Sequence, residues 1–140
     1  MNEIKIGVVG YCPPTKFDEV KAAQMIEEAY SKTQAAFPDR SVVIVSGLTN
    51  VGVLAIAYAE ATSRRWRTVG IACKKAVEHR WYPVDESIIV GTNWGDESPT
   101  FLKSLDGIIR IGGGKQSYRE VEVIKSLGKF VLEYDLPALN

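Results

Sequence analysis

Short apolar runs alternate with segments of helical character along the whole chain of 140 residues. The apolar runs, which predict strands, cover residues 4–9, 41–46, 68–72, 87–90, 107–111 and 129–133. The helical segments, recognised by apolar spacing or by a start signal, cover residues 18–37, 51–65, 98–105 and 118–127. Continuous apolar strands joined by helical crossovers are typical of a parallel sheet covered on both faces. The alternation therefore predicts an α/β Rossmann-like three-layer sandwich with a mainly parallel sheet of about six strands.

The composition is that of a globular protein without net charge. Apolar residues make up 46% and charged residues 24% of the chain, which excludes a disordered or collagen-like protein. The 17 basic and 17 acidic residues give a formal net charge of +0, so no long-range field attracts nucleic acid or an anionic membrane. We expect one domain over residues 1–140, with neither nucleic acid nor a membrane as partner. The absence of net charge also permits a homodimer or a higher homo-oligomer.

The first residues and the cysteines indicate the cellular setting. The start of the chain lacks the basic and apolar regions of a signal peptide, and no apolar run approaches the roughly 20 residues of a membrane helix. Cys12 and Cys73 are far apart and in no metal-ligand spacing. These features favour a cytoplasmic protein with no metal site, and a disulfide between the two cysteines is the weaker interpretation.

The loop after the strand at residues 107–111 is the first candidate site, because ligands in such sheets bind beyond the carboxyl ends of the strands. It contains Gly112, Gly113 and Gly114, followed by Lys115, Gln116 and Ser117. Glycines let a ligand approach the backbone, and free amides at a helix start attract an anion. The spacing fits neither a Walker A loop nor the dinucleotide fingerprint. We predict a phosphate site here; the alternative is a strand-to-helix turn that merely requires glycine.

Ser117 and Glu120 follow the glycines and stand in the spacing of a capping box. In that motif the serine accepts from the amide of Glu120, and the carboxylate reaches back to the amide of Ser117. The functional alternative makes Glu120 a ribose ligand or a general acid/base at the phosphate site. The two interpretations do not exclude each other.

Three further loops supply candidate ligand residues at the same predicted edge. They contribute Gly10 and Tyr11 as a pocket wall, Gly47, Thr49 and Asn50 at a helix start, and Trp94, Asp96 and Glu97 after the fourth strand. Trp94 is suited to stack on a base, and the two acids to accept from ribose hydroxyls. The structural alternatives are an N-cap for Asn50 and, for the acids, a favourable charge before the helix that Ser98 caps. We assign the lone histidine, His79, to a packed or oligomer-facing surface.

Residues 112–120 resemble the P-G-G-x-G-T-x-x-E motif of the lonely-guy (LOG) phosphoribohydrolases. Gly113 and Gly114 match the paired glycines, Ser117 stands for the threonine and Glu120 matches the glutamate. Residues 46–52 are similar to the family's G-G-G-x-x-G segment, and residues 106–109 to the run before the motif. The resemblance covers nearly the whole chain. It implies a Rossmann-like fold, nucleotide-type ligands and frequent homodimers, within a SLOG superfamily that also includes molybdenum-cofactor carrier proteins.

The chain also departs from the hydrolase pattern. Gly112 replaces the motif's proline, Gln116 replaces its third glycine, and residues 96–101 lack the arginine that the hydrolases carry before the fifth strand. That arginine steadies the nucleotide phosphate, so the resemblance is closer to carrier or sensor members than to the enzymes.

Three functions stay open at this point. The first is binding of a phosphorylated nucleotide-like or pterin-type ligand by a carrier or sensor, with no certain cofactor. The alternative is an enzyme, a nucleoside-monophosphate phosphoribohydrolase with Glu120 as the catalytic carboxylate. The third is an oligomeric scaffold whose pocket is empty.

Overall fold

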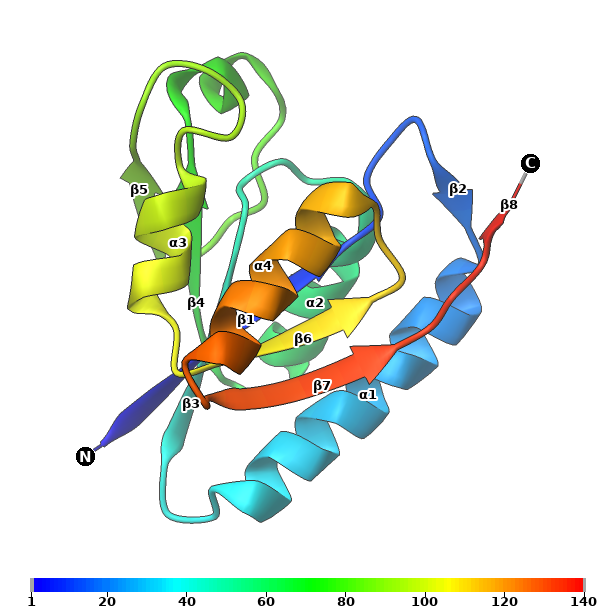
Figure 1. Ribbon diagram of the computed structural model, residues 1–140, viewed down its shortest axis with the longest axis vertical. Coiled ribbons are helices and arrows are strands. Elements are labelled where there is room, and N and C mark those ends of the chain that lie inside the picture. Colours follow the sequence, from blue (N-terminus) through cyan, green and yellow to red (C-terminus); the bar gives the residue numbers. More distant parts are fainter. Residues whose placement is uncertain (1, 140) are drawn as a thin grey trace.

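Six parallel strands form the centre of the molecule in the computed structural model, which describes residues 2–139 (Figure 1). The strands are β1 (Glu3–Gly10), β3 (Ser41–Ser46), β4 (Arg67–Ala72), β5 (Glu86–Ile89), β6 (Gly107–Ile111) and β7 (Phe130–Tyr134). Their order is β5-β4-β3-β1-β6-β7, and every neighbouring pair is parallel. The predicted α/β Rossmann-like sheet is confirmed. The strand order reverses at β1, which pairs with β3 on one side and β6 on the other.

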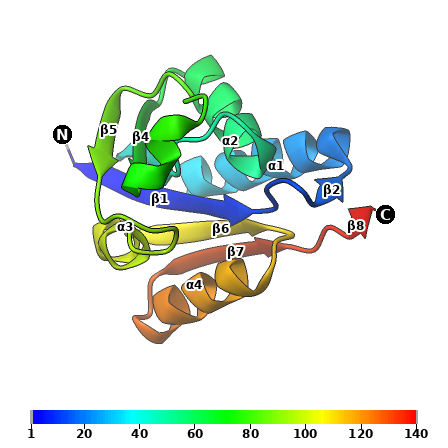
Figure 2. The ribbon, with the colours of Figure 1, turned by 90° about the horizontal axis from the view of Figure 1, so that it is seen from above.

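Helices cover both faces of the sheet, as Figure 2 shows from above. Helices α1 (Glu19–Ala36) and α2 (Gly52–Ser63) lie on one face, and α3 (Ser98–Ser104) and α4 (Lys115–Ser126) on the other. Alternate residues of β3 enter different cores: Ile44 packs on the α1–α2 side, whereas Val43 and Val45 pack on the α3–α4 side. Burial on both faces explains why the strands are apolar without interruption.

Helix α1 shows how local signals set an element's bounds. The side chain of Asp18 accepts from the amide of Lys21 at 3.1 Å and caps the helix start, where its charge also complements the dipole. Apolar residues spaced three and four apart, including Ile26 and Tyr30, are fully buried. The predicted helix over residues 18–37 is therefore observed to within one residue at each end.

The starts of the other helices correct three predictions. Val51, not Asn50, is the N-cap of α2, and Glu97, not Ser98, is the N-cap of α3. Helix α4 begins at Lys115, three residues before the predicted start, with Gly114 as its N-cap. The reason lies in Gly112 and Gly113, whose φ angles of +58° and +104° turn the chain sharply enough for the helix to follow at once.

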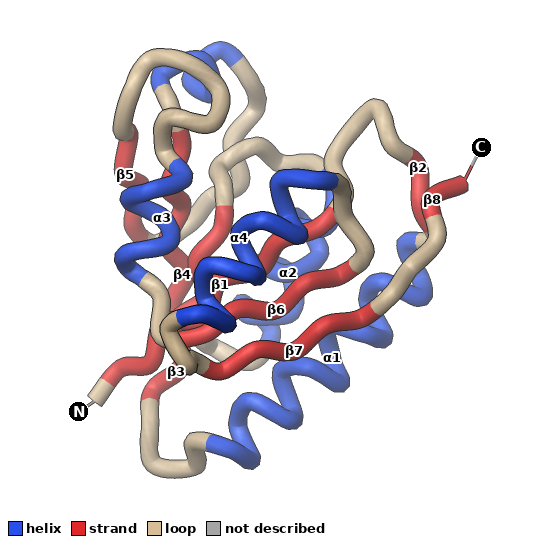
Figure 3. Tube along the Cα trace, viewed as in Figure 1, coloured by secondary structure: helices blue, strands red, loops and turns tan. Residues whose placement is uncertain are grey.

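A small antiparallel sheet joins the chain end to the loop after β1. It pairs β2 (Lys16–Phe17) with β8 (Ala138–Leu139). Close by, the hydroxyl of Tyr11 donates to the carbonyl of Leu136 at 2.7 Å. A short 3-10 helix, η1 (Lys74–Glu78), follows β4. The loops after β1, β3, β4 and β6 lie at the carboxyl ends of parallel strands, and they gather at one edge of the sheet (Figure 3).

Candidate functional site

A cleft of about 760 Å³ lies among these loops. Its walls come from the ends of β1, β3 and β4, the loops after them, the start of α2, the loop before α3 with the start of that helix, and the first turn and a half of α4. The volume is within the range of small-molecule sites, and the position, next to the reversal of strand order at β1, is where such sheets bind ligands. The structure thus brings residues from distant parts of the chain to one cavity.

The start of α4 forms one wall of the cleft, through Gly114, Lys115, Gln116 and Ser117. Within residues 2–139, the amides of residues 113–117 donate to no acceptor, and the first bonded amide is that of Tyr118, to the carbonyl of Gly114. Five consecutive amides are therefore free at the positive end of a helix dipole.

The three glycines of this loop play different parts. A Cβ on Gly112 would overlap the ring of Tyr11, and one on Gly113 would lie 2.6 Å from Oγ of Ser117. Both positions also have positive φ, so the fold itself requires glycine there, and neither residue lines the cleft. Gly114 has an ordinary φ of −102°, and a Cβ there would meet nothing within 4 Å. The space beside Gly114 belongs to the cleft.

Glu120 lies on the wall of the cleft, 7% exposed. Its Oε2 accepts from Oγ of Ser98 on α3 at 2.8 Å, so the predicted capping box with Ser117 is wrong. Ser117 is the third residue of α4 and therefore not its N-cap, which is the position that the serine of a capping box occupies. Burial raises the pKa of the Glu120 carboxyl, and hydrogen bonds from Ser98 and Gln116 oppose that rise only in part.

The loops after β1 and β3 bring four of their five predicted residues to the cleft. Gly10, Tyr11, Gly47 and Thr49 line it. Asn50 does not: its amide donates to the carbonyl of Arg80 at 2.8 Å, which ties the loop after β3 to the segment after η1.

The loop before α3 brings two of its three predicted residues to the cleft. Trp94, 56% exposed, and Glu97 line the cleft, but Asp96 does not. The carboxylate of Asp96 accepts from the amides of Thr92 at 3.0 Å and Asn93 at 2.8 Å, and these bonds lower its pKa. Asp96 therefore holds the loop in shape.

Sequence reasoning missed several polar residues of the cleft, among them Ser98 and His79. Ser98 was interpreted only as a helix cap, yet it lines the cleft and bonds to Glu120. His79 also lines the cleft, with its ring centroid 5.6 Å from that of Trp94. Each lies in a segment that follows a strand. The rule that ligands bind beyond the carboxyl ends of strands would therefore have included both.

The side-chain charges of the cleft are few. Lys115 is the one lysine or arginine among the lining residues within 2–139, and Glu97 and Glu120 are the acids. The same part of the chain holds no group of three or more side chains arranged to bind a metal ion. None of its helices has the length and apolar character needed to cross a membrane.

Known structures share this fold. A molybdenum cofactor carrier protein from Chlamydomonas reinhardtii superposes with a TM-score of 0.70 at 20% identity, over 94% of this chain and 76% of that one. The molybdenum cofactor binding protein of Rippkaea orientalis superposes with a TM-score of 0.73 at 24% identity, over 95% and 77%. The fold is that of molybdenum cofactor carrier proteins. This confirms the resemblance to carrier members at the level of fold. No protein-family model matches the chain, and no curated protein matches it in sequence.

Proposed function

We propose that the protein binds a phosphorylated small molecule, a nucleotide-like or pterin-type ligand, in the cleft at the carboxyl edge of the sheet. The observation that carries the proposal is the start of α4, where residues 114–117, whose amides are free, and the charge of Lys115 line the cleft. Free amides at a helix start bind phosphate in many unrelated proteins. The names of the structural neighbours support a pterin-type ligand, because the molybdenum cofactor is one.

The rest of the cleft suits the organic part of such a ligand. Ile71, Leu54 and Phe101 give apolar surface, and Trp94 offers an exposed ring for stacking at the rim. Glu120 supplies a buried carboxyl that a ligand N–H or O–H would reach from inside the cleft. A single lysine suits one phosphate group better than a di- or triphosphate.

Calorimetry against nucleoside monophosphates and phosphorylated pterins tests this function. We expect at least one ligand to bind with a Kd well below millimolar, and Lys115→Met to weaken it. If no member of the panel binds below millimolar, the proposal fails. Light scattering on the same samples tests the predicted homodimer or higher homo-oligomer.

The buried carboxyl favours one second function, hydrolysis of a nucleoside monophosphate. Water would add across the N-glycosidic bond to give free base and ribose 5-phosphate, with Glu120 giving or taking the proton. A raised pKa at Glu120 suits that role. Against it, residues 96–101 contain no arginine. Chromatography for free base after incubation with AMP decides the matter, and Glu120→Gln must abolish any activity found.

A further inference from the structure

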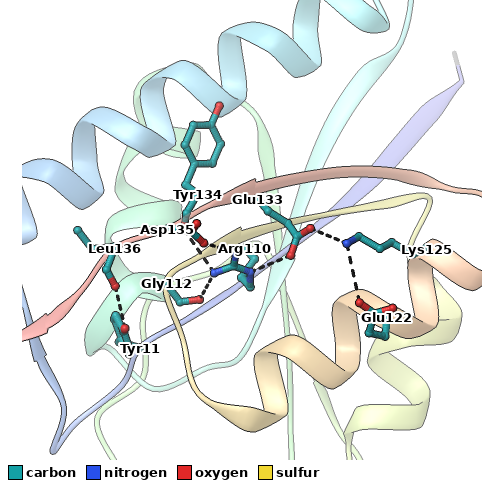
Figure 4. Close-up of polar contacts among 9 residues, drawn as sticks. All are labelled: Tyr11, Arg110, Gly112, Glu122, Lys125, Glu133, Tyr134, Asp135 and Leu136. Carbon is teal, nitrogen blue, oxygen red and sulfur yellow. Dashed lines mark hydrogen bonds and ion pairs between the residues drawn. The ribbon is translucent and has the colours of Figure 1, made fainter.

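A buried arginine lies directly behind the glycine loop. Arg110, on β6, is 3% exposed and does not line the cleft. Its Nη1 donates to the carbonyl of Gly112 at 2.8 Å (Figure 4). The ring of Tyr118 packs on the guanidinium, with its centroid 4.3 Å from Cζ. Burial of an unpaired charge costs several kcal/mol, so the guanidinium of Arg110 needs partners of opposite charge at this position.

Two carboxylates of the neighbouring strand and its end supply the partners. The Nε of Arg110 donates to Glu133 at 3.0 Å, and its Nη2 donates to Asp135 at 2.8 Å. Glu133 also pairs with Lys125 of α4 at 2.7 Å, so strand β7 and helix α4 are joined through the same group (Figure 4). The guanidinium is therefore held in one orientation, with Nη1 aimed at the loop.

That orientation fixes the peptide between Gly112 and Gly113. The C=O and N–H of a trans peptide point in opposite directions. Because the carbonyl of Gly112 points at Arg110, the amide of Gly113 points away from the guanidinium. This amide is the first of the five, at residues 113–117, that have no acceptor within residues 2–139.

A lock is needed here because two glycines in succession leave this peptide free to turn over. Their φ angles of +58° and +104° lie in the region that only glycine adopts easily, and glycine also adopts the alternatives. Gly113 does not itself line the cleft, but its peptide leads directly into Gly114, which does. A flipped peptide would replace an N–H by a carbonyl oxygen at the start of α4 and redirect the chain that enters the cleft wall. We propose that Arg110 is a positioning residue that locks the Gly112–Gly113 peptide so that the loop presents N–H groups to the phosphate of the bound ligand. This inference rests on the proposed function.

The test compares the Kd for inorganic phosphate, measured by calorimetry, in the wild type and in Arg110→Met. Methionine keeps an unbranched chain but donates nothing to Gly112, so we expect binding to weaken about tenfold or more. Two matched controls change the outer partners and leave the bond from Arg110 to Gly112 in place: Lys125→Met and Asp135→Asn. The side chain of Asp135 is 91% exposed. Both controls should bind phosphate within about twofold of the wild type.

Folding is followed separately, by urea unfolding and by the dispersion of the amide NMR spectrum. A role confined to stability would lower the free energy of unfolding of Arg110→Met and leave its Kd unchanged. If the methionine variant does not fold, Arg110→Lys replaces it: lysine keeps the buried charge but has a single nitrogen in place of the three that bond Gly112, Glu133 and Asp135. We then expect phosphate binding to weaken about fivefold.

The outcomes separate the two proposals. A folded Arg110 variant that binds phosphate as tightly as the wild type would overturn the lock and leave phosphate binding intact. A wild type that binds neither phosphate at tens of millimolar nor any ligand of the panel below millimolar would overturn the proposed function, and the lock with it. If only a ligand of the panel binds, its Kd takes the place of the Kd for phosphate in the same comparison.

Discussion

Helices α2 and α4 both begin at the cleft, directly after a strand, yet their first turns differ. At α2 the amides of Asn50, Val51 and Val53 donate to the carbonyls of Arg80, Thr49 and Tyr11. At α4 the amides of residues 113–117 donate to no acceptor within residues 2–139. The protein uses the start of α2 to hold its own loops together and keeps the start of α4 open.

The difference shows that a helix start beside a cavity is not by itself a binding site. What separates the two starts is the tertiary contact each one makes. The loop before α2 is tied to the segment after η1, and that before α4 is held from behind by Arg110, which leaves its amides free. The proposed function therefore assigns the phosphate to α4 and not to α2, although the sequence offered both loops.

The largest expected effect comes from adding a methyl group to the loop before α4. Gly112→Ala should lower the free energy of unfolding by about 2 kcal/mol or more, because Cβ overlaps the Tyr11 ring at a positive φ. Gly114→Ala is the matched control, with open space and an ordinary φ, and should cost no more than about 1 kcal/mol, the loss expected from alanine at a helix N-cap. Its methyl group enters the cleft, so ligand affinity should fall nonetheless. Urea unfolding and calorimetry measure both effects, and equal losses of stability would contradict the division of roles.

A smaller effect is expected from the polar side chain at each helix start, Lys115 at α4 and Asn50 at α2. Lys115→Met should weaken binding of a phosphorylated ligand about fivefold, since the ammonium group stands at the wall where the phosphate is placed. Asn50→Ala, at the start of α2, should change the Kd by less than about twofold. Calorimetry with the same ligand measures both variants. The reverse order would move the phosphate to α2.

The sheet could be predicted because each strand is marked by a local run of apolar residues. Parts of the site could not be predicted, because they depend on contacts between distant residues. The strands at residues 41–46 and 107–111 match β3 and β6 residue for residue, since continuous apolar runs mark burial on both faces. The pairing of Ser117 with Glu120 failed because a tertiary partner, Ser98, lies 22 residues away and no local pattern announces it. Arg110 was missed for the same reason, as its carboxylate partners lie 23 and 25 residues further on.

The smallest expected effect is on the pH dependence of stability. It concerns α4 and not α2, because Glu120 of α4 carries a buried carboxyl at the cleft. Because burial raises the pKa of Glu120 above the ordinary 4.5, the folded protein holds this proton when the unfolded chain has lost it. The free energy of unfolding should therefore fall as pH rises from about 4.5 through the raised pKa of Glu120. Glu120→Gln should remove this decline, so the difference between the two proteins across pH isolates one group.

Ser98→Ala provides the opposite change at the same carboxyl. The hydroxyl of Ser98 lowers the pKa of Glu120, so its removal should raise that pKa further and enlarge the decline in stability. Urea unfolding at a series of pH values records both variants. Parallel curves for Glu120→Gln and the wild type would show that the carboxyl is not desolvated in solution.

The contrast between the two helix starts can be observed amide by amide in a ¹⁵N NMR titration of the wild-type protein with a nucleoside monophosphate. Phosphate held at α4 should shift the amide signals of residues 113–117 most strongly and in a saturable way, while those of Asn50, Val51 and Val53 move little, because the latter are already bonded within the protein. Saturable shifts centred on Asn50, Val51 and Val53, with the signals of residues 113–117 unmoved, would contradict the account.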